Sequence, residues 1–170
     1  PATATQPQRP KTSNTDPRMS TILNTEGTTL EIPKPARGGD FRAVIITARW
    51  NAPITGALTD GAIGTLHAAG VADDRITRLQ VPGTVELVNA AAAAIDALSP
   101  DAVIVIGCVI RGDTPHFDYV CQGVTQGIAD INARGGVPVI FGVLPANRLE
   151  EAQERAGGSL GNKGAEAAVA

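Results

Sequence analysis

The chain has 170 residues, of which 43 % are hydrophobic and 18 % charged, as is typical of a globular protein with one substantial core. Its formal net charge of −3 gives no reason to expect a nucleic acid or an anionic membrane as partner. No apolar run approaches the roughly 20 residues of a membrane-spanning helix. The N-terminus lacks the apolar stretch of a secretory signal, so we expect a cytoplasmic protein.

Residues 1–40 are expected to form a flexible N-terminal extension. Residues 1–20 carry four prolines among Thr, Ser, Gln and Asn, with almost nothing to bury. Leu30 and Ile32 alternate with polar residues and suggest an arm that lies along a neighbouring surface or sheet edge. A transit peptide, or an internal start at Met19, remains an alternative for this stretch.

The folded domain is expected over residues 41–170, where apolar runs that predict strands alternate with patterns at helical spacing. The expected strands are Phe41–Ala48, Ile76–Val81, Ala102–Ile110 and Val137–Leu144. The helical patterns run from Ile54 to Leu66, from Val85 to Ile95 and from Val120 to Ile131. This alternation predicts an α/β protein, a three-layer α/β/α sandwich in which a four-stranded, parallel, flavodoxin-like sheet has helices on both faces.

The C-terminal tail follows the fourth strand. Its pattern predicts a short helix near residues 149–156, a glycine-rich turn over residues 157–164 and the start of another helix. That last helix has no stop signal, which leaves open that the protein continues past Ala170.

The carboxyl ends of the four strands should meet at one rim, where ligands bind in open parallel sheets. The third strand breaks at Arg111-Gly112-Asp113, and a helix follows with Thr114 as the expected N-cap and Pro115 as its first residue. A helix N-terminus presents free N–H groups and a partial positive charge, which suit an anion. The sequence therefore predicts an anion site at this rim.

A phosphate turn is the form that we expect this anion site to take. Its candidates are Gly112, Asp113 and Thr114, with the Asp113 carboxylate turned away from the anion. Such a turn needs a basic partner, and Arg155 and Lys163 of the C-terminal tail are available. Because the tail of a doubly wound subunit need not reach its own rim, a neighbouring subunit is a reasonable source.

Other rim side chains are candidates for contact with an organic substrate. His116 can exchange protons near neutrality, because an imidazole has an ordinary pKa near 6.5. Trp50 directly follows the first strand, where its indole would stack on a planar heteroaromatic ring or else cap the edge of the core. Glu86 suits the dipole of the second helix, and binding of substrate hydroxyls is an equally open role. His67 is expected to be a filler at the surface or core edge.

The two cysteines, Cys108 and Cys121, do not have metal-ligand spacing. We expect both to be buried free thiols and predict no metal site.

Several motifs in this order resemble the lumazine synthase family of riboflavin biosynthesis. The most specific one is GCVIRGDTPHFDYVC, over residues 107–121. The weaker ones are Ala48–Asn51, Val81–Leu87, Gly135–Leu144, Glu154–Gly157 and Gly161–Gly164. Together they span about residues 41–170, so the N-terminal extension lies outside the resemblance.

The resemblance implies condensation of 5-amino-6-(D-ribitylamino)uracil with 3,4-dihydroxy-2-butanone 4-phosphate. The products are 6,7-dimethyl-8-ribityllumazine, phosphate and water, formed through an imine, elimination of phosphate and ring closure, with no metal or organic cofactor. The family builds pentamers, sometimes twelve in an icosahedral shell, with active sites between subunits. The compact turn over residues 157–164 resembles that of the shell-forming members.

The resemblance also implies roles for single residues. Substrate-binding residues would be Trp50, Asn51, Thr84, Val85, Glu86, Cys108, Val109, Ile110 and Phe141. In this set the tryptophan stacks on the pyrimidine, residues 84–86 hold the ribityl chain and ring, and the backbone of residues 108–110 reads the uracil edge. Phosphate-binding residues would be Gly112, Asp113, Thr114, Arg155 and Lys163. His116 would transfer protons, and the neighbouring subunit would supply Phe141 and Arg155.

Two stretches depart from the family pattern. Residues 144–148, Leu-Pro-Ala-Asn-Arg, replace a threonine-rich segment, and Ser159 stands where many members have lysine. Two other functions remain open: a non-catalytic flavin- or lumazine-binding shell protein, and an unrelated flavodoxin-like binding or signalling domain. His116 and Arg155 argue against the first, because a carrier needs neither.

Overall fold

The structure is a computed structural model that describes residues 31–170. Most of the expected N-terminal extension therefore lies outside the described residues. The segment before the sheet contains a 3-10 turn, Gly38–Asp40, and is tied to the start of the third strand through Asp101. The carboxylate of Asp101 accepts hydrogen bonds from Arg37 Nη1 (2.7 Å) and from the backbone N–H of Arg42 (2.8 Å).

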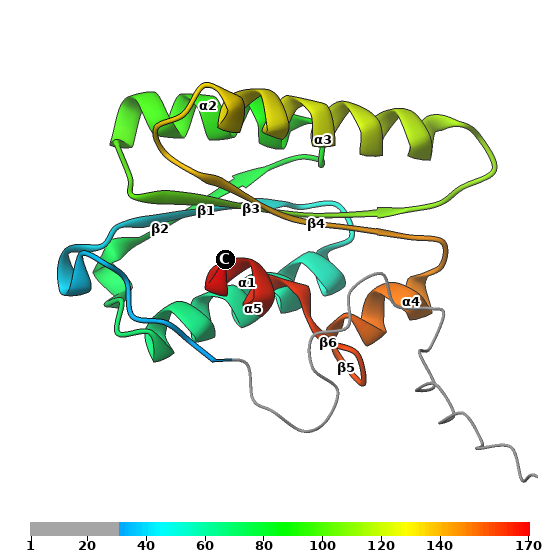
Figure 1. The fold of residues 1–170 in the computed structure, drawn as a ribbon. Coiled ribbons are helices and arrows are strands. Elements are labelled where there is room, and N and C mark those ends of the chain that lie inside the picture. The colour runs from blue at the N-terminus through cyan, green and yellow to red at the C-terminus, as the bar shows by residue number, and fades with distance from the viewer. Residues whose placement is uncertain (1–30) are drawn as a thin grey trace, which may run out of the picture. The chain divides into compact units, whose positions relative to one another are not determined.

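A four-stranded parallel sheet in the order β2-β1-β3-β4 forms the middle layer of the domain. Its strands are β1 (Ala43–Ala48), β2 (Ile76–Val81), β3 (Ala102–Ile110) and β4 (Val139–Ala146). The helices are α1 (Ala52–Ala68), α2 (Glu86–Leu98), α3 (His116–Ala133), α4 (Leu149–Glu154) and α5 (Lys163–Val169). Figure 1 shows α2 and α3 on one face of the sheet and α1 and α5 on the other. This arrangement confirms the three-layer α/β/α sandwich.

Hydrophobic side chains pack on both faces of the sheet, because alternate residues of a strand point to opposite sides. All six residues of β1 are buried: Ile45 packs in the cluster under α1 and α5, whereas Val44 and Ile46 pack under α2 and α3. Burial on both faces accounts for the nearly continuous apolar runs by which the central strands were predicted.

The observed boundaries agree with the predicted ones for β2 and β3. β1 begins two residues later than expected, and β4 lies two residues further along the chain. The prediction that Thr114 caps α3 is wrong. Pro115 already has helical angles (φ −63°, ψ −2°), its carbonyl accepts from Asp118 and Tyr119, and no side chain caps the helix, which begins at His116.

Pro145 lies inside β4, in the segment that departs from the family pattern. The carbonyl of the next residue, Ala146, accepts a hydrogen bond from Arg111 beyond β3, so the ring nitrogen of Pro145 faces away from β3. In the described part of the chain that side is the open edge of the sheet, where a missing N–H costs nothing. The helix that follows is stabilised by the carboxylate of Glu151, which accepts from the Asn147 N–H at 3.0 Å.

The C-terminal tail is anchored on α1. The glycine-rich turn is a small antiparallel hairpin of β5 (Ala156–Gly158) and β6 (Gly161–Asn162). The side chain of Asn162 caps α5 through the N–H groups of Gly164 and Ala165, and its amide donates to the carbonyl of Ala57 in α1 at 2.9 Å. At Gly164 the two helices touch so closely that an added Cβ would lie 1.8 Å from the Leu58 carbonyl oxygen.

We predict that Gly164→Ala lowers the free energy of unfolding by about 1–3 kcal/mol, because α5 must move off α1. The matched control is Gly64→Ala in α1, where an added Cβ would meet nothing within 4 Å. That variant should be stabilised by about 0.5–1 kcal/mol, since alanine favours a helix interior. Urea denaturation measures both, and equal stability of the two variants would contradict the close contact.

Candidate functional site

The loops after β1 and β2 run side by side at the carboxyl rim of the sheet. The backbone N–H of Arg49 donates to Val81 at 2.9 Å, and that of Trp50 donates to Pro82 at 3.1 Å. The hydrogen-bond ladder thus continues past the ends of both strands. It holds the only tryptophan of the chain beside the loop that leads into α2.

The indole of Trp50 lies against the backbone of Gly83. A Cβ added at Gly83 would come within 2.6 Å of two indole carbons, so only glycine fits beneath the ring. The Gly83 N–H donates to the carboxylate of Glu86 at 2.9 Å, so Glu86 stabilises the turn before α2. The Trp50 residue nevertheless remains 67 % exposed, which leaves indole surface open for stacking rather than buried in the core.

Asn51 joins the β1 loop to the end of β3. Its backbone is left-handed (φ 60°, ψ 40°), a conformation that asparagine tolerates better than most residues. Its side-chain amide donates to the Cys108 carbonyl at 2.9 Å. The two residues, both expected to bind substrate, are therefore bonded to each other and fix the β1 loop against β3.

The segment at residues 84–86 also packs against β3. Thr84 is buried, and a Cβ added at Gly107 would come within 3.0 Å of the Thr84 side chain. Val85, in contrast, is 54 % exposed beside the rim. Val109 and Ile110 are half-buried at the end of β3. The predicted substrate-binding residues of β1, β2 and β3 thus converge at one rim.

The predicted phosphate turn follows β3 directly. Residues 111–116 are all exposed, and His116 is the first residue of α3. Within residues 31–170, no side chain of Asp113, Thr114 or His116 makes a hydrogen bond or ion pair with another residue. These groups are accessible for the roles that the sequence predicts.

Phe141 lies away from this rim, and Arg155 and Lys163 lie on the other face of the sheet from α3. Phe141 pairs with Val105 in the middle of β3, five residues before the end of β4. That separation is roughly 16 Å along a strand, so Phe141 does not lie at the rim of its own chain. Arg155 and Lys163 flank the hairpin beneath α1, on the face opposite α3, and Lys163 is ion-paired with Glu166.

Both cysteines are free, as expected. Cys108 is 3 % exposed, and burial raises the pKa of its thiol to about 11. Cys121 is only partly buried, so the expectation of two buried thiols is wrong for this residue, although partial burial also raises its pKa. Among residues 31–170, no group of three or more His, Cys, Asp or Glu side chains could hold a metal ion. No helix in that range is long and apolar enough to cross a membrane.

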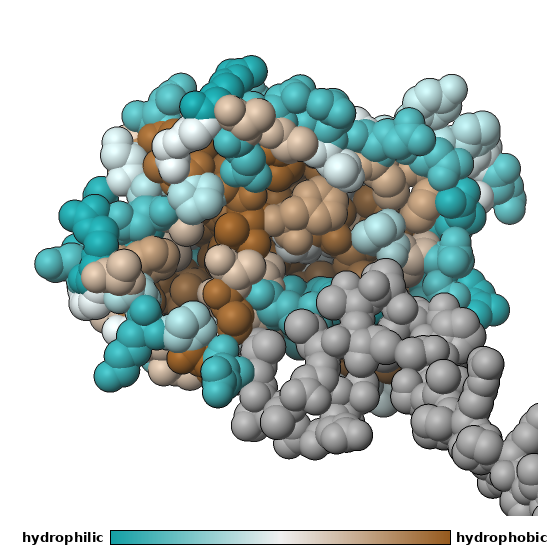
Figure 2. All heavy atoms as spheres, viewed as in Figure 1, coloured by the Kyte–Doolittle hydropathy of each residue, from teal (hydrophilic) through white to brown (hydrophobic). Residues whose placement is uncertain are grey.

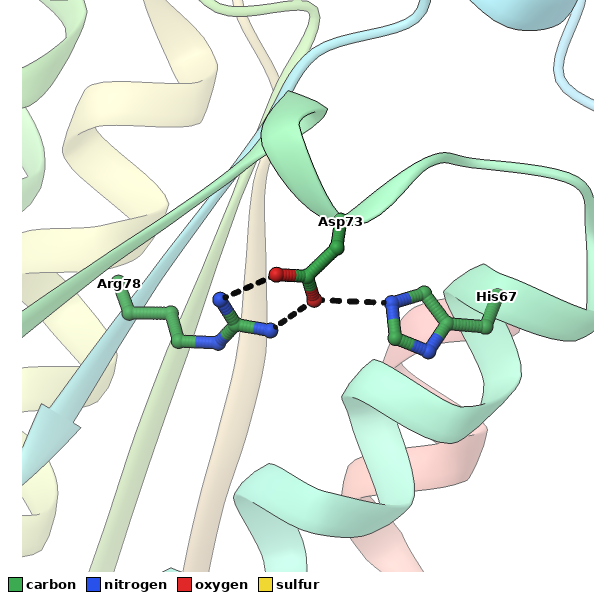
Figure 3. Close-up of polar contacts among 3 residues, drawn as sticks. All are labelled: His67, Asp73 and Arg78. Carbon is green, nitrogen blue, oxygen red and sulfur yellow. Dashed lines mark hydrogen bonds and ion pairs between the residues drawn. The ribbon is translucent and has the colours of Figure 1, made fainter.

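His67 lies at the surface, one of the two positions expected for it. Figure 3 shows its ring pointing to Asp73, which also binds the guanidinium of Arg78. The hydrogen bonds from Arg78 hold the pKa of the Asp73 carboxyl below its usual value. These residues come from the end of α1, the turn before β2 and the middle of β2, and they are separate from the carboxyl rim.

Asn51 provides a test of the rim geometry. Asn51→Gly keeps the left-handed backbone but loses the hydrogen bond to Cys108, whereas Asn51→Ala loses the bond and adds backbone strain. We therefore expect Asn51→Ala to be less stable than Asn51→Gly by roughly 1–2 kcal/mol. Denaturant unfolding measured by the fluorescence of Trp50 tests this order, and an equally stable alanine variant would contradict it.

Residues 40–170 match the family model described as 6,7-dimethyl-8-ribityllumazine synthase. A protein of that name from Porphyromonas gingivalis is 58 % identical over 132 residues, which cover 78 % of this chain and 82 % of that protein. One from Bacteroides fragilis is 54 % identical over 125 residues, 74 % of this chain and 87 % of that protein. One from Flavobacterium johnsoniae is 49 % identical over 131 residues, which cover 77 % of this chain and 69 % of that protein.

Proposed function

The chain belongs to the 6,7-dimethyl-8-ribityllumazine synthase family, and we propose in detail how its residues condense 5-amino-6-(D-ribitylamino)uracil with 3,4-dihydroxy-2-butanone 4-phosphate. It is an enzyme of riboflavin biosynthesis, a transferase. The non-catalytic carrier is not favoured, since the relatives are named as synthases. The observation that carries the proposal is the exposed indole of Trp50, held on Gly83 at the same rim of the sheet from which the turn to His116 starts.

The proposed pyrimidine site uses the three loops that meet at the rim. The indole of Trp50 stacks on the ring. Thr84, Val85 and Glu86 line the ribityl chain, and the backbone after Gly107 reads the uracil edge. Because the Cys108 carbonyl already accepts from Asn51, we assign the reading of the uracil edge mainly to Val109 and Ile110. Asn51 then acts by holding these loops together.

The proposed phosphate site is the turn at residues 112–114. Backbone N–H groups and the Thr114 hydroxyl bind the phosphate of the second substrate at the start of α3. His116 transfers protons during imine formation, phosphate elimination and ring closure. Holding both substrates together supplies a large share of the rate by itself, and a positioned acid or base contributes roughly 10²–10⁴-fold more.

The site is proposed to be completed by an adjacent subunit. In one chain the rim is open to solvent, and Phe141 is 40 % exposed on β4, far from its own rim. Figure 2 shows hydrophobic side chains gathered across the middle of the face along which β4 runs in Figure 1. Burial of such a surface favours association. We propose a cytoplasmic pentamer, with a 60-subunit shell as a further stage, in which Phe141, Arg155 and Lys163 face the neighbour's rim.

The first test is turnover of both substrates, followed by lumazine absorbance after subtraction of the uncatalysed rate. Wild type should form lumazine. His116→Ala should lower kcat by roughly 10²-fold, the lower end of what a positioned acid or base contributes. His67→Ala is the matched control, because His67 is exposed and pairs with Asp73 away from the rim. Absence of product from the folded wild-type assembly would refute the proposed activity.

A mixing experiment tests whether the site is shared between subunits. His116→Ala and Arg155→Ala should each have low activity, the second mainly through a higher KM for the phosphate-bearing substrate. When the two variants are refolded together, about a quarter of the sites should regain both residues, since each site draws them from different subunits. If the activity of the mixture does not exceed the mean activity of the two separate variants, both residues belong to the site of the same chain.

A further inference from the structure

Arg111 connects the ends of β3 and β4 at the carboxyl rim. Its backbone N–H donates to the Ala146 carbonyl at 2.9 Å, one residue beyond the end of β3. Its Nε donates to the side-chain oxygen of Asn147 at 3.2 Å. The backbone of Arg111 is therefore part of the hydrogen-bond ladder of the sheet. Its side-chain Nε is held by Asn147, in the loop that leads to α4.

The far end of the same side chain holds the first turn of α3. Nη2 and Nη1 of Arg111 donate to the two carboxylate oxygens of Asp118, at 2.9 and 3.3 Å. The guanidinium carbon also lies 4.1 Å from the centre of the Phe117 ring, and Phe117 is buried. A planar fork on a carboxylate, combined with stacking on an aromatic ring, is an arrangement that lysine cannot reproduce.

These contacts bracket the predicted phosphate turn. Arg111 precedes the turn, Phe117 and Asp118 follow it, and the five residues between them are exposed. Within the described chain the polar side chains among them, those of Asp113, Thr114 and His116, have no hydrogen bond or ion pair. The position of His116 relative to β3 therefore depends on what holds the two ends of the turn.

We propose that Arg111 is a positioning residue, which sets the phosphate turn and His116 for reaction through its contacts with Asp118, Phe117 and Asn147. The inference rests on the proposed function and deepens it. Arg111 acts through the turn and does not contact the phosphate, because both terminal nitrogens of its guanidinium already donate to the carboxylate of Asp118. Direct binding of the phosphate by Arg111 is the competing role, and the experiment separates the two.

The experiment compares Arg111→Ala with a matched control in the full-length assembly. Arg78→Ala removes a similar arginine fork, on Asp73, with similar exposure of the arginine side chain, but away from the rim (Figure 3). We expect Arg111→Ala to lower kcat by between about tenfold and a hundredfold, since small displacements of catalytic groups have effects of that size. KM for the pyrimidine should change little, because the contacts of Trp50 do not involve Arg111. Arg78→Ala should keep wild-type kcat.

Amide hydrogen exchange gives a readout that does not depend on activity. Exchange at residues 112–118 should be faster in Arg111→Ala than in wild type and unchanged in Arg78→Ala. If wild type forms no lumazine, the proposed function fails, and the exchange rates alone then test whether the contacts of Arg111 with Asp118, Phe117 and Asn147 hold the turn in place. If wild type is active, and Arg111→Ala keeps both its kcat and slow exchange in the turn, the inference is overturned.

Two further variants distinguish positioning from charge. Arg111→Lys keeps the positive charge without the fork, so positioning predicts a kcat nearly as low as that of Arg111→Ala, whereas phosphate binding predicts rescue. Asp118→Asn frees the guanidinium, and positioning predicts a loss of kcat that is not additive with the loss from Arg111→Ala. Wild-type kcat in Arg111→Lys and in Asp118→Asn would support direct phosphate binding and overturn the inference.

Discussion

The carboxyl rim depends on a parallel hydrogen-bond ladder that continues past the ends of the strands. Trp50 donates to Pro82 beyond the ends of β1 and β2, and Arg111, the residue after β3, donates to Ala146 at the end of β4. These bonds extend the register of the sheet, whose central strands are buried on both faces, into loops that have little hydrophobic burial of their own. Trp50 can therefore remain largely exposed and still be held in one place.

The topology separates the two groups of residues that the proposed chemistry requires. The loops that carry Trp50 and His116 lie at the carboxyl rim, whereas the hairpin between Arg155 and Lys163 is fastened under α1, on the other face of the sheet. Phe141 lies on β4, well before the rim. Under the proposed function a single chain holds only part of each site, so association between subunits is a requirement of the chemistry and not only a source of stability.

The parts of the site that could be predicted are those whose sequence signal comes from neighbouring residues. Trp50 and His116 could be singled out because each closely follows a buried strand, and the ends of parallel strands must meet at one rim. The clamp of Arg111 on Asp118 was missed, because an acidic residue in a first helical turn is already explained by the helix dipole. Their separation of seven residues across an exposed turn gives no periodic signal, and only the folded loop brings the two side chains together.

The sequence by itself determined the fold class, the four strands and the family, because hydrophobic periodicity and local motifs are properties of neighbouring residues. It could not place Phe141, since the end of β4 depends on its register with β3 and on the open edge that accommodates Pro145. Nor could it show that Asn51 bonds to Cys108, because these residues are 57 positions apart. Such contacts are decided by strand order and by the packing of loops, which arise only when the whole chain has folded.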